Sequence, residues 1–194
     1  PGGAAMAMCG SAMLLAFIFL GYPQITNRPG LLYSFVFLIN AGVLAGIVIN
    51  PKLGAGQIIA GLLTFAHLAV WTTEKLKPEA LNSALAAYFV FGVLHSVFPV
   101  VWQRLKPGNA FALHGAFSPW FPPLTLVLML LPVMSLPDAS FVIWPAILLV
   151  DALAIVVAVT TSILLPVLVA LLLTLGATFL WLLKAPPQIT SLSP

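Results

Sequence analysis

Asp151 is the residue whose type and position point most directly to chemistry. It is the only charged residue in a long apolar stretch between residues 139 and 183. Placing an aspartate at the centre of a membrane helix costs about 2.5 to 3.5 kcal/mol on insertion scales, so its presence requires a compensating interaction. Two interpretations follow. Asp151 is either a proton or cation site that faces a polar cavity, or a protonated or hydrogen-bonded group that joins two helices.

Asn40 and His95 complete, with Asp151, a candidate intramembrane polar site. Counting about 1.5 Å per residue from the predicted loops on one membrane side places Asn40 about 14 Å deep, Asp151 about 18 Å and His95 about 20 Å. The three side chains could therefore share one layer. An aspartate next to a histidine could pass protons, and hydrogen bonding between helices is the structural alternative.

His67 and His95 are candidate axial ligands. The same count places His67 about 9 to 10 Å deep, so the two imidazoles differ by about 10 Å and do not fit around one metal. Each could singly hold a haem or a chlorophyll-type pigment, since imidazole binds such metals and apolar helices suit the ring. The single cysteine, Cys9, excludes an internal disulfide and any zinc site built from cysteines.

The elements that would position these residues are apolar helices. The chain is 62% hydrophobic and only 6% charged, whereas soluble domains carry roughly 25% charged residues. We therefore predict an all-α fold, a polytopic transmembrane helical bundle of about six or seven spans that forms one integral membrane domain over residues 1–194. The candidate spans are 4–21, 31–50, 54–73, 83–102, 121–136, 139–160 and 163–183.

Two of these spans depend on weaker signals. The run 121–136 begins with two prolines and contains a third, which favours either a kinked span or a re-entrant segment. The apolar stretch from 139 to 183 is too long for one span, and Thr160-Thr161-Ser162 is its only polar interruption. We predict two helices joined by a tight turn there.

The charges and motifs narrow the classes of function. The net charge of +3 comes from scattered lysines and arginines, so we expect membrane lipids and other membrane-protein subunits as partners, and no nucleic acid. No phosphate-binding loop, dinucleotide-binding glycine pattern, zinc-protease motif or nucleophile elbow occurs in the sequence, which favours a role other than catalysis. Small residues four apart, such as Gly42 with Gly46 and Gly56 with Ala60, predict close helix packing.

The first three predicted helices carry a family resemblance. The run from Gly2-Gly3 to Ser11, the segment 33–44 (YSFVFLINAGVL), Trp71 and the Lys77-Pro78-Glu79 loop resemble a bacterial family of long polytopic proteins, catalogued as domain of unknown function 2339. The resemblance covers residues of about 1–135. It implies a segment or shortened relative of such proteins, and the family supplies no catalytic residues.

Three functional hypotheses follow from these observations. The first is a structural or accessory subunit of a membrane assembly, with the bacterial inner membrane as its expected location. The second is a proton- or ion-coupled transporter or channel module that uses Asp151. The third is a pigment- or haem-carrying membrane subunit that uses His67 or His95.

Overall fold

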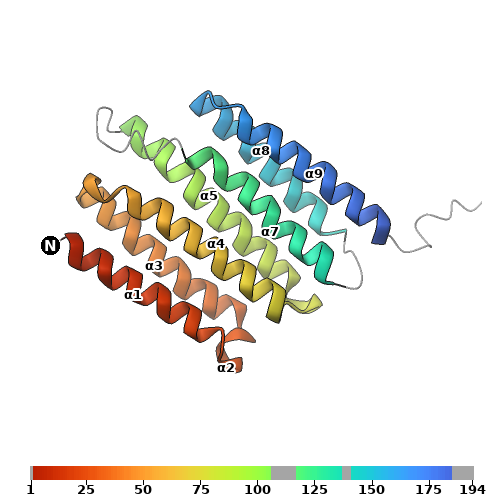
Figure 1. Cartoon of the computed structure of the whole chain (residues 1–194), viewed down its shortest axis with the longest axis horizontal. Helices are drawn as coiled ribbons and strands as arrows, with labels where there is room; N and C mark the ends of the chain where they lie inside the picture. Colours follow the sequence, from red (N-terminus) through yellow and green to blue (C-terminus); the bar gives the residue numbers. More distant parts are fainter. Residues whose placement is uncertain (1, 106–116, 137–140, 185–194) are drawn as a thin grey trace, which may run out of the picture.

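The computed structural model describes residues 2–105, 117–136 and 141–184, with the backbone alone at residues 2, 3, 5, 6 and 184. These residues form an all-α bundle, as the composition predicts, and the described part contains no β-strand. Long helices run side by side with their axes nearly parallel (Figure 1). Their order is α1 (Gly2–Phe19), α2 (Pro23–Thr26), α3 (Pro29–Ile49), η1 (Pro51–Leu53), α4 (Ala55–Lys75), η2 (Pro78–Ala80), α5 (Leu81–Leu105), η3 (Ser118–Trp120), α7 (Phe121–Ser135), α8 (Ile143–Thr161) and α9 (Leu165–Lys184).

Six of the described helices are long and apolar enough to cross a membrane. They are α3, α4, α5 with η2, α7 with η3, α8 and α9. The apolar part of α1, Ala7–Phe19, is shorter than these, although the helix itself fills most of the predicted span 4–21. Each of the seven predicted runs thus contains one helix, with ends that differ from the prediction by a few residues. The length and apolar character of the six helices identify an integral membrane protein.

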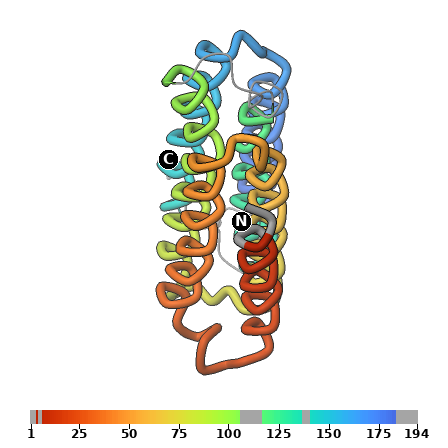
Figure 2. The backbone as a smooth tube through the Cα atoms, turned by 90° about the vertical axis from the view of Figure 1, so that its left-hand side faces the viewer, coloured from red at the N-terminus to blue at the C-terminus, as the bar shows by residue number. Residues whose placement is uncertain are grey.

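The long helices form two layers. One layer contains α1, α4, α7 and α9, and the other contains α3, α5 and α8 (Figures 1 and 2). The chain crosses between the layers, so each central helix touches several others: α4 packs against α1, α3, α5 and α7. The hydrophobic core therefore lies along α4, α5 and α7, and α1 and α9 lie at opposite ends of the bundle.

Short turns alternate the direction of the helices. At the turn between α3 and α4, the Asn50 side chain accepts a hydrogen bond from the Lys52 backbone N–H at 3.2 Å. At the turn between α8 and α9, Ser162 adopts a left-handed conformation with φ 59° and ends α8. The predicted turn at Thr160-Thr161-Ser162 is therefore confirmed. A left-handed residue at this position is a common way for a helix to end.

The proline-rich run 121–136 forms one continuous helix, α7. Pro122 and Pro123 lie in its first turn, where backbone N–H groups have no partner inside the helix, so the prolines cost no hydrogen bond there. Pro132 lies inside the helix, three residues before it ends at Ser135. With η3, α7 is long enough to span a membrane, which favours a spanning helix over a re-entrant segment.

Gly61 in α4 and Gly92 in α5 both lie close against side chains of α7. A methyl group added at Gly61 would lie 2.5 Å from Phe121 Cε1, and one added at Gly92 would overlap the Thr125 side chain. The predicted pair of small residues on α3, Gly42 and Gly46, is packed more loosely. A methyl group added at Gly42 would have Cys9 Sγ as its nearest neighbour, at 3.6 Å, and one added at Gly46 would meet open space. Glycine is needed where α7 packs.

Candidate functional site

Asp151 lies half-buried at the contact between α8 and α9. The Thr174 hydroxyl of α9 is 3.0 Å from Asp151 Oδ1 and 2.9 Å from Oδ2. A hydroxyl has one hydrogen, so it donates to only one of the two carboxylate oxygens at a time. No lysine, arginine or histidine among the described side chains forms an ion pair with Asp151. The carboxylate therefore joins two helices while keeping further capacity to accept hydrogen bonds.

The surface around this pair is apolar. One turn away on α8, Ile147 and Ala154 are buried, whereas Leu148 and Ile155 are exposed. Asp151 thus lies at the border between the buried side of α8 and the side that faces lipid. On α9, Leu171 and Leu175 flank Thr174 and are exposed. At the ends of α8 and α9 that lie away from their connecting turn, the Trp144 and Trp181 rings meet edge to face, with centroids 5.8 Å apart.

Asn40 is fully engaged on its donor side. Its Nδ2 donates to the Val36 carbonyl oxygen at 2.8 Å and to the Thr64 hydroxyl of α4 at 2.8 Å. The amide oxygen has no hydrogen-bond partner among the described residues. The side chain is 1% exposed. Asn40 therefore ties α3 to α4 in the interior of the bundle.

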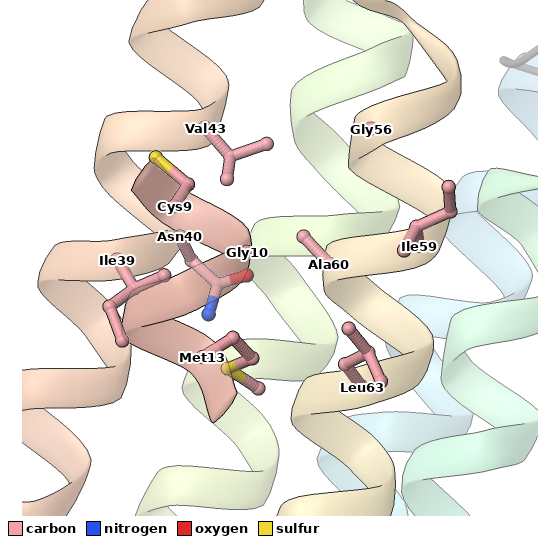
Figure 3. Close-up of a pocket in the computed structure, with 10 residues that line it drawn as sticks. All are labelled: Cys9, Gly10, Met13, Ile39, Asn40, Val43, Gly56, Ile59, Ala60 and Leu63. Atoms are coloured by element: carbon pink, nitrogen blue, oxygen red, sulfur yellow. The ribbon is translucent and has the colours of Figure 1, made fainter. Parts of the chain in front are cut away.

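A cavity of about 190 Å³ lies beside Asn40, between α1, α3 and α4 (Figure 3). Apart from the asparagine amide and the Cys9 thiol, its lining consists of apolar side chains and glycines: Gly10, Met13, Ile39, Val43, Gly56, Ile59, Ala60 and Leu63. Ligand pockets usually enclose about 300 to 1,000 Å³, so this one is small. It holds no cluster of titratable groups that could catalyse a reaction.

His67 binds the backbone of α1. Its Nε2 lies 3.2 Å from the Ala16 carbonyl oxygen, so Nε2 carries the proton and donates it to this oxygen. The ring is 0% exposed, and Phe17 meets it edge to face with centroids 5.2 Å apart. The imidazole thus anchors α1 to α4.

His95 is enclosed by aromatic rings at the contact of α4, α5 and α7. Its ring stacks on Phe121 with centroids 5.0 Å apart, and Phe65 meets it edge to face at 6.4 Å. The side chain is 0% exposed, and neither ring nitrogen has a hydrogen-bond partner among the described residues. The Gln57 amide donates to the His95 backbone oxygen at 3.0 Å. The histidine side chain is therefore a buried packing group.

Both histidine side chains are fully buried, so a tetrapyrrole could reach a ring nitrogen only if neighbouring helices moved apart. An imidazole that binds a haem iron points one ring nitrogen at the metal. The tetrapyrrole therefore needs open space beside that nitrogen. His67 Nε2 faces a carbonyl oxygen, and a methyl group added at Gly61 would lie only 3.0 Å from His95 Nδ1. Among the described residues, no group of three or more histidines, cysteines or acids could hold a metal ion.

The structure does not join the three predicted polar residues into one site. Asn40 forms a hydrogen bond with Thr64 of α4, and Asp151 forms one with Thr174 of α9. The His95 ring forms no hydrogen bond with Asn40 or Asp151. Depth counting gave each residue a height in the membrane but not a direction around its helix. An Asp151–His95 hydrogen bond, which a direct proton exchange would use, does not occur between these residues.

Sequence reasoning missed the role of α4 as the polar centre of the bundle. Gln57 binds α5, Thr64 binds α3, and Thr72 shares a hydrogen bond with Tyr88 of α5. The Trp71 indole N–H donates to a backbone carbonyl oxygen of α2 at 3.2 Å. A usable signal was present in the sequence, because α4 carries several polar residues spaced along an otherwise apolar run. Thr174, the partner of Asp151, carried no such signal.

Comparison with known proteins adds no relative. No family model matches the chain, and neither the curated proteins nor the solved structures include a match. The resemblance to the bacterial polytopic family stays a prediction.

Proposed function

We propose that this protein is a structural or accessory subunit of a membrane assembly and that it contacts its partner through α8 and α9. The observation that carries the proposal is Asp151, which is half-buried at an apolar surface with one neutral hydroxyl as its hydrogen-bond partner among the described residues. Acidic residues in membrane helices usually face a bundle interior or a polar cavity. A partner helix packed on α8 and α9 would place Asp151 in such an interior.

The remaining polar groups support the same proposal. Gln57, Thr64 and His67 each bind a backbone or side chain of a neighbouring helix. Such bonds between helices hold a membrane bundle together and require no substrate. These side chains are fully buried, so a partner cannot reach them, whereas Asp151 retains acceptor capacity at the edge of the bundle.

The apolar surface of α8 and α9 supplies the area for a partner. Large side chains on this surface are more than half exposed, including Leu148, Ile155, Val159, Leu168, Leu172 and Phe179. Lipid can cover such a surface equally well, so the apolar area alone identifies no partner. The Asp151–Thr174 pair gives this apolar surface a polar contact point. A donor from a partner helix would complete the hydrogen bonding of the carboxylate there.

The test is the size of the complex in native membranes. The protein would be extracted in a mild detergent and its complex separated on a native gel, with Asp151→Asn beside the wild type. We expect the wild type in a complex larger than the monomer and the variant mainly as a folded monomer. Thr160→Val, at the exposed end of α8, is the matched control and should leave the complex intact. An unchanged complex in Asp151→Asn would contradict the proposal.

Proton- or ion-coupled transport is the second candidate, and the same carboxylate favours it. A carboxyl group inside the membrane, such as that of Asp151, can bind and release a proton. In proteoliposomes, a transport role predicts a pH-dependent flux that Asp151→Asn abolishes. A flux that the variant leaves unchanged would remove Asp151 from any such pathway.

The expected bacterial inner-membrane location and the pigment-carrying alternative stay proposals of lower rank. An absorption spectrum of the purified protein tests the pigment hypothesis directly. A Soret or chlorophyll-type band that His67→Leu or His95→Leu removes would support it, and a colourless preparation would eliminate it.

A further inference from the structure

We propose that the cleft between α3 and α5 binds one anionic phospholipid, with the headgroup phosphate at Lys75 and Lys77 and an acyl chain along the helices. The proposal rests on two adjoining cavities, one polar and one apolar, that share Ser83 in their linings. It does not depend on the α8–α9 surface or on any role of Asp151.

The apolar cavity has the shape and lining that an acyl chain requires. It measures about 580 Å³ and lies between α3 and α5, with Phe37, Val90 and Phe91 among its lining residues. Small residues on α5, Ala86 and Ala87, leave room between the helices. The lined segments, 30–38 and 83–91, each extend about 12 Å at 1.5 Å per residue. One leaflet contributes about 15 Å to the hydrocarbon core, so the cleft reaches through most of one leaflet.

The polar cavity lies where the headgroup would be. It measures about 250 Å³ and is formed at the ends of α3, α4 and α5 by residues that include Asn27, Lys75, Lys77 and Glu79. The 21 residues of α3 and of α4 give each helix a length of about 31 Å, close to the thickness of the hydrocarbon core. Their ends therefore lie at headgroup level on this side of the membrane.

The charges of the polar cavity favour an anionic lipid. Two lysines line it against one acid, Glu79. Glu74 lies 3.8 Å from the Lys75 ammonium, but both side chains are well exposed, and exposed pairs of this kind interact weakly. The first turn of α3, which also borders the cavity at Pro29, contains no acidic residue. The positive end of the α3 helix dipole adds further attraction for a phosphate.

Tyr33 lies where the apolar cavity approaches the polar one. It lines the apolar cavity near its polar end and is 7% exposed, yet its hydroxyl has no hydrogen-bond partner among the described residues. Trp71, which lines the polar cavity, meets the Tyr33 ring edge to face at 5.3 Å and fixes its position. Buried hydroxyl groups are nearly always bonded. The hydroxyl oxygen is closed off in this arrangement, so a lipid oxygen would accept its hydrogen bond only after a shift of the Tyr33 side chain.

The test is lipid binding to the purified full chain by native mass spectrometry. Phosphatidylglycerol and phosphatidylcholine would be titrated separately onto delipidated protein, and the occupancy of the first bound lipid measured. We expect phosphatidylglycerol to bind more tightly than phosphatidylcholine. Lys77→Gln should weaken phosphatidylglycerol binding about fivefold, since a lysine near a lipid surface contributes on the order of 1 kcal/mol. Lys52→Gln removes the same charge at the opposite end of the bundle and should have no effect.

A second pair of variants tests the acyl-chain cleft. Ala86→Phe fills the cavity from an exposed position on α5 and should remove the first bound lipid, with Ala86→Leu as a milder variant if folding suffers. Ala7→Phe, at an exposed position of α1, is the matched control and should bind as the wild type does. Three results would each overturn the proposal. The first is equal binding of the two lipids, and the second is equal effects of Lys77→Gln and Lys52→Gln. The third is full occupancy in both Ala86 variants.

Discussion

Helix α4 and the α8–α9 pair use their polar residues differently. Gln57, Thr64 and His67 of α4 are all fully buried and bind three different neighbouring helices, whereas Asp151 is half-buried and binds only within its own helix pair. The packing follows the same division. In the apolar stretch of α7, next to α4, 61% of the residues are buried, compared with 17% in α9. The polar groups at the centre of the bundle are thus enclosed by its own helices, whereas the α8–α9 end retains exposed surface and an accessible acceptor.

If this division is correct, mutations at the centre should affect stability most. The largest effect is expected for Gly61→Ala, because the added methyl group would overlap the buried ring of Phe121, which is held by Phe65 and His95. Overpacking of this kind costs about 1 to 3 kcal/mol. The measurement is the unfolding free energy in mixed micelles. Gly46→Ala, which has open space around it, should be neutral or slightly stabilising. Equal effects of the two substitutions would show that α7 is not closely packed on α4.

A second prediction concerns the hydrogen bond between α4 and α5. The Thr72 hydroxyl donates to the Leu68 carbonyl oxygen, so it accepts a hydrogen bond from Tyr88. Tyr88→Phe should destabilise the protein by about 0.6 kcal/mol and by no more than about 1.7 kcal/mol, the average and the maximum measured for hydrogen bonds between membrane helices.

A double-mutant cycle with Thr72→Val isolates this bond. The two substitutions together should cost less than the sum of their separate effects. Additive effects would show that the two hydroxyl groups do not interact, and they would weaken the description of α4 as the polar centre.

The sequence predicts the helices well because the lipid environment constrains their length. Each of the seven runs contains a helix, and Thr160-Thr161-Ser162 turns as predicted. The candidate site was less predictable. Residue counting gives depth but not the direction of a side chain around its helix, so Asn40, His95 and Asp151 could be placed in one layer but not beside their partners. Those partners are backbone carbonyl groups and threonine hydroxyl groups, which have no distinctive spacing.

The turn between α8 and α9 gives a third, smaller prediction. Ser162 has φ 59°, a conformation that glycine adopts without the steric cost of a side chain. Ser162→Gly should stabilise the protein by up to about 1 kcal/mol, measured again as the unfolding free energy. Ser162→Ala keeps a side-chain carbon and should give no gain. If both variants are destabilised, the serine side chain itself contributes to the turn.

The smallest effect on stability is expected for Asp151→Asn. The amide keeps the shape of the carboxylate and still accepts the hydrogen bond from Thr174, so the unfolding free energy should change by less than about 0.6 kcal/mol. A loss as large as that of Gly61→Ala would instead mean that Asp151 holds the isolated bundle together. Asp151 would then resemble the polar residues of α4, and the comparison between the two regions would fail.

The most direct test of the proposed role is the assembly state of the Asp151→Asn variant in native membranes. The account predicts that the variant folds with wild-type stability yet leaves the larger complex and migrates as a monomer on a native gel, while the Thr160→Val control stays in the complex. A variant that remains in a complex of wild-type size would contradict the proposal that Asp151 and the surface of α8 and α9 contact a partner subunit.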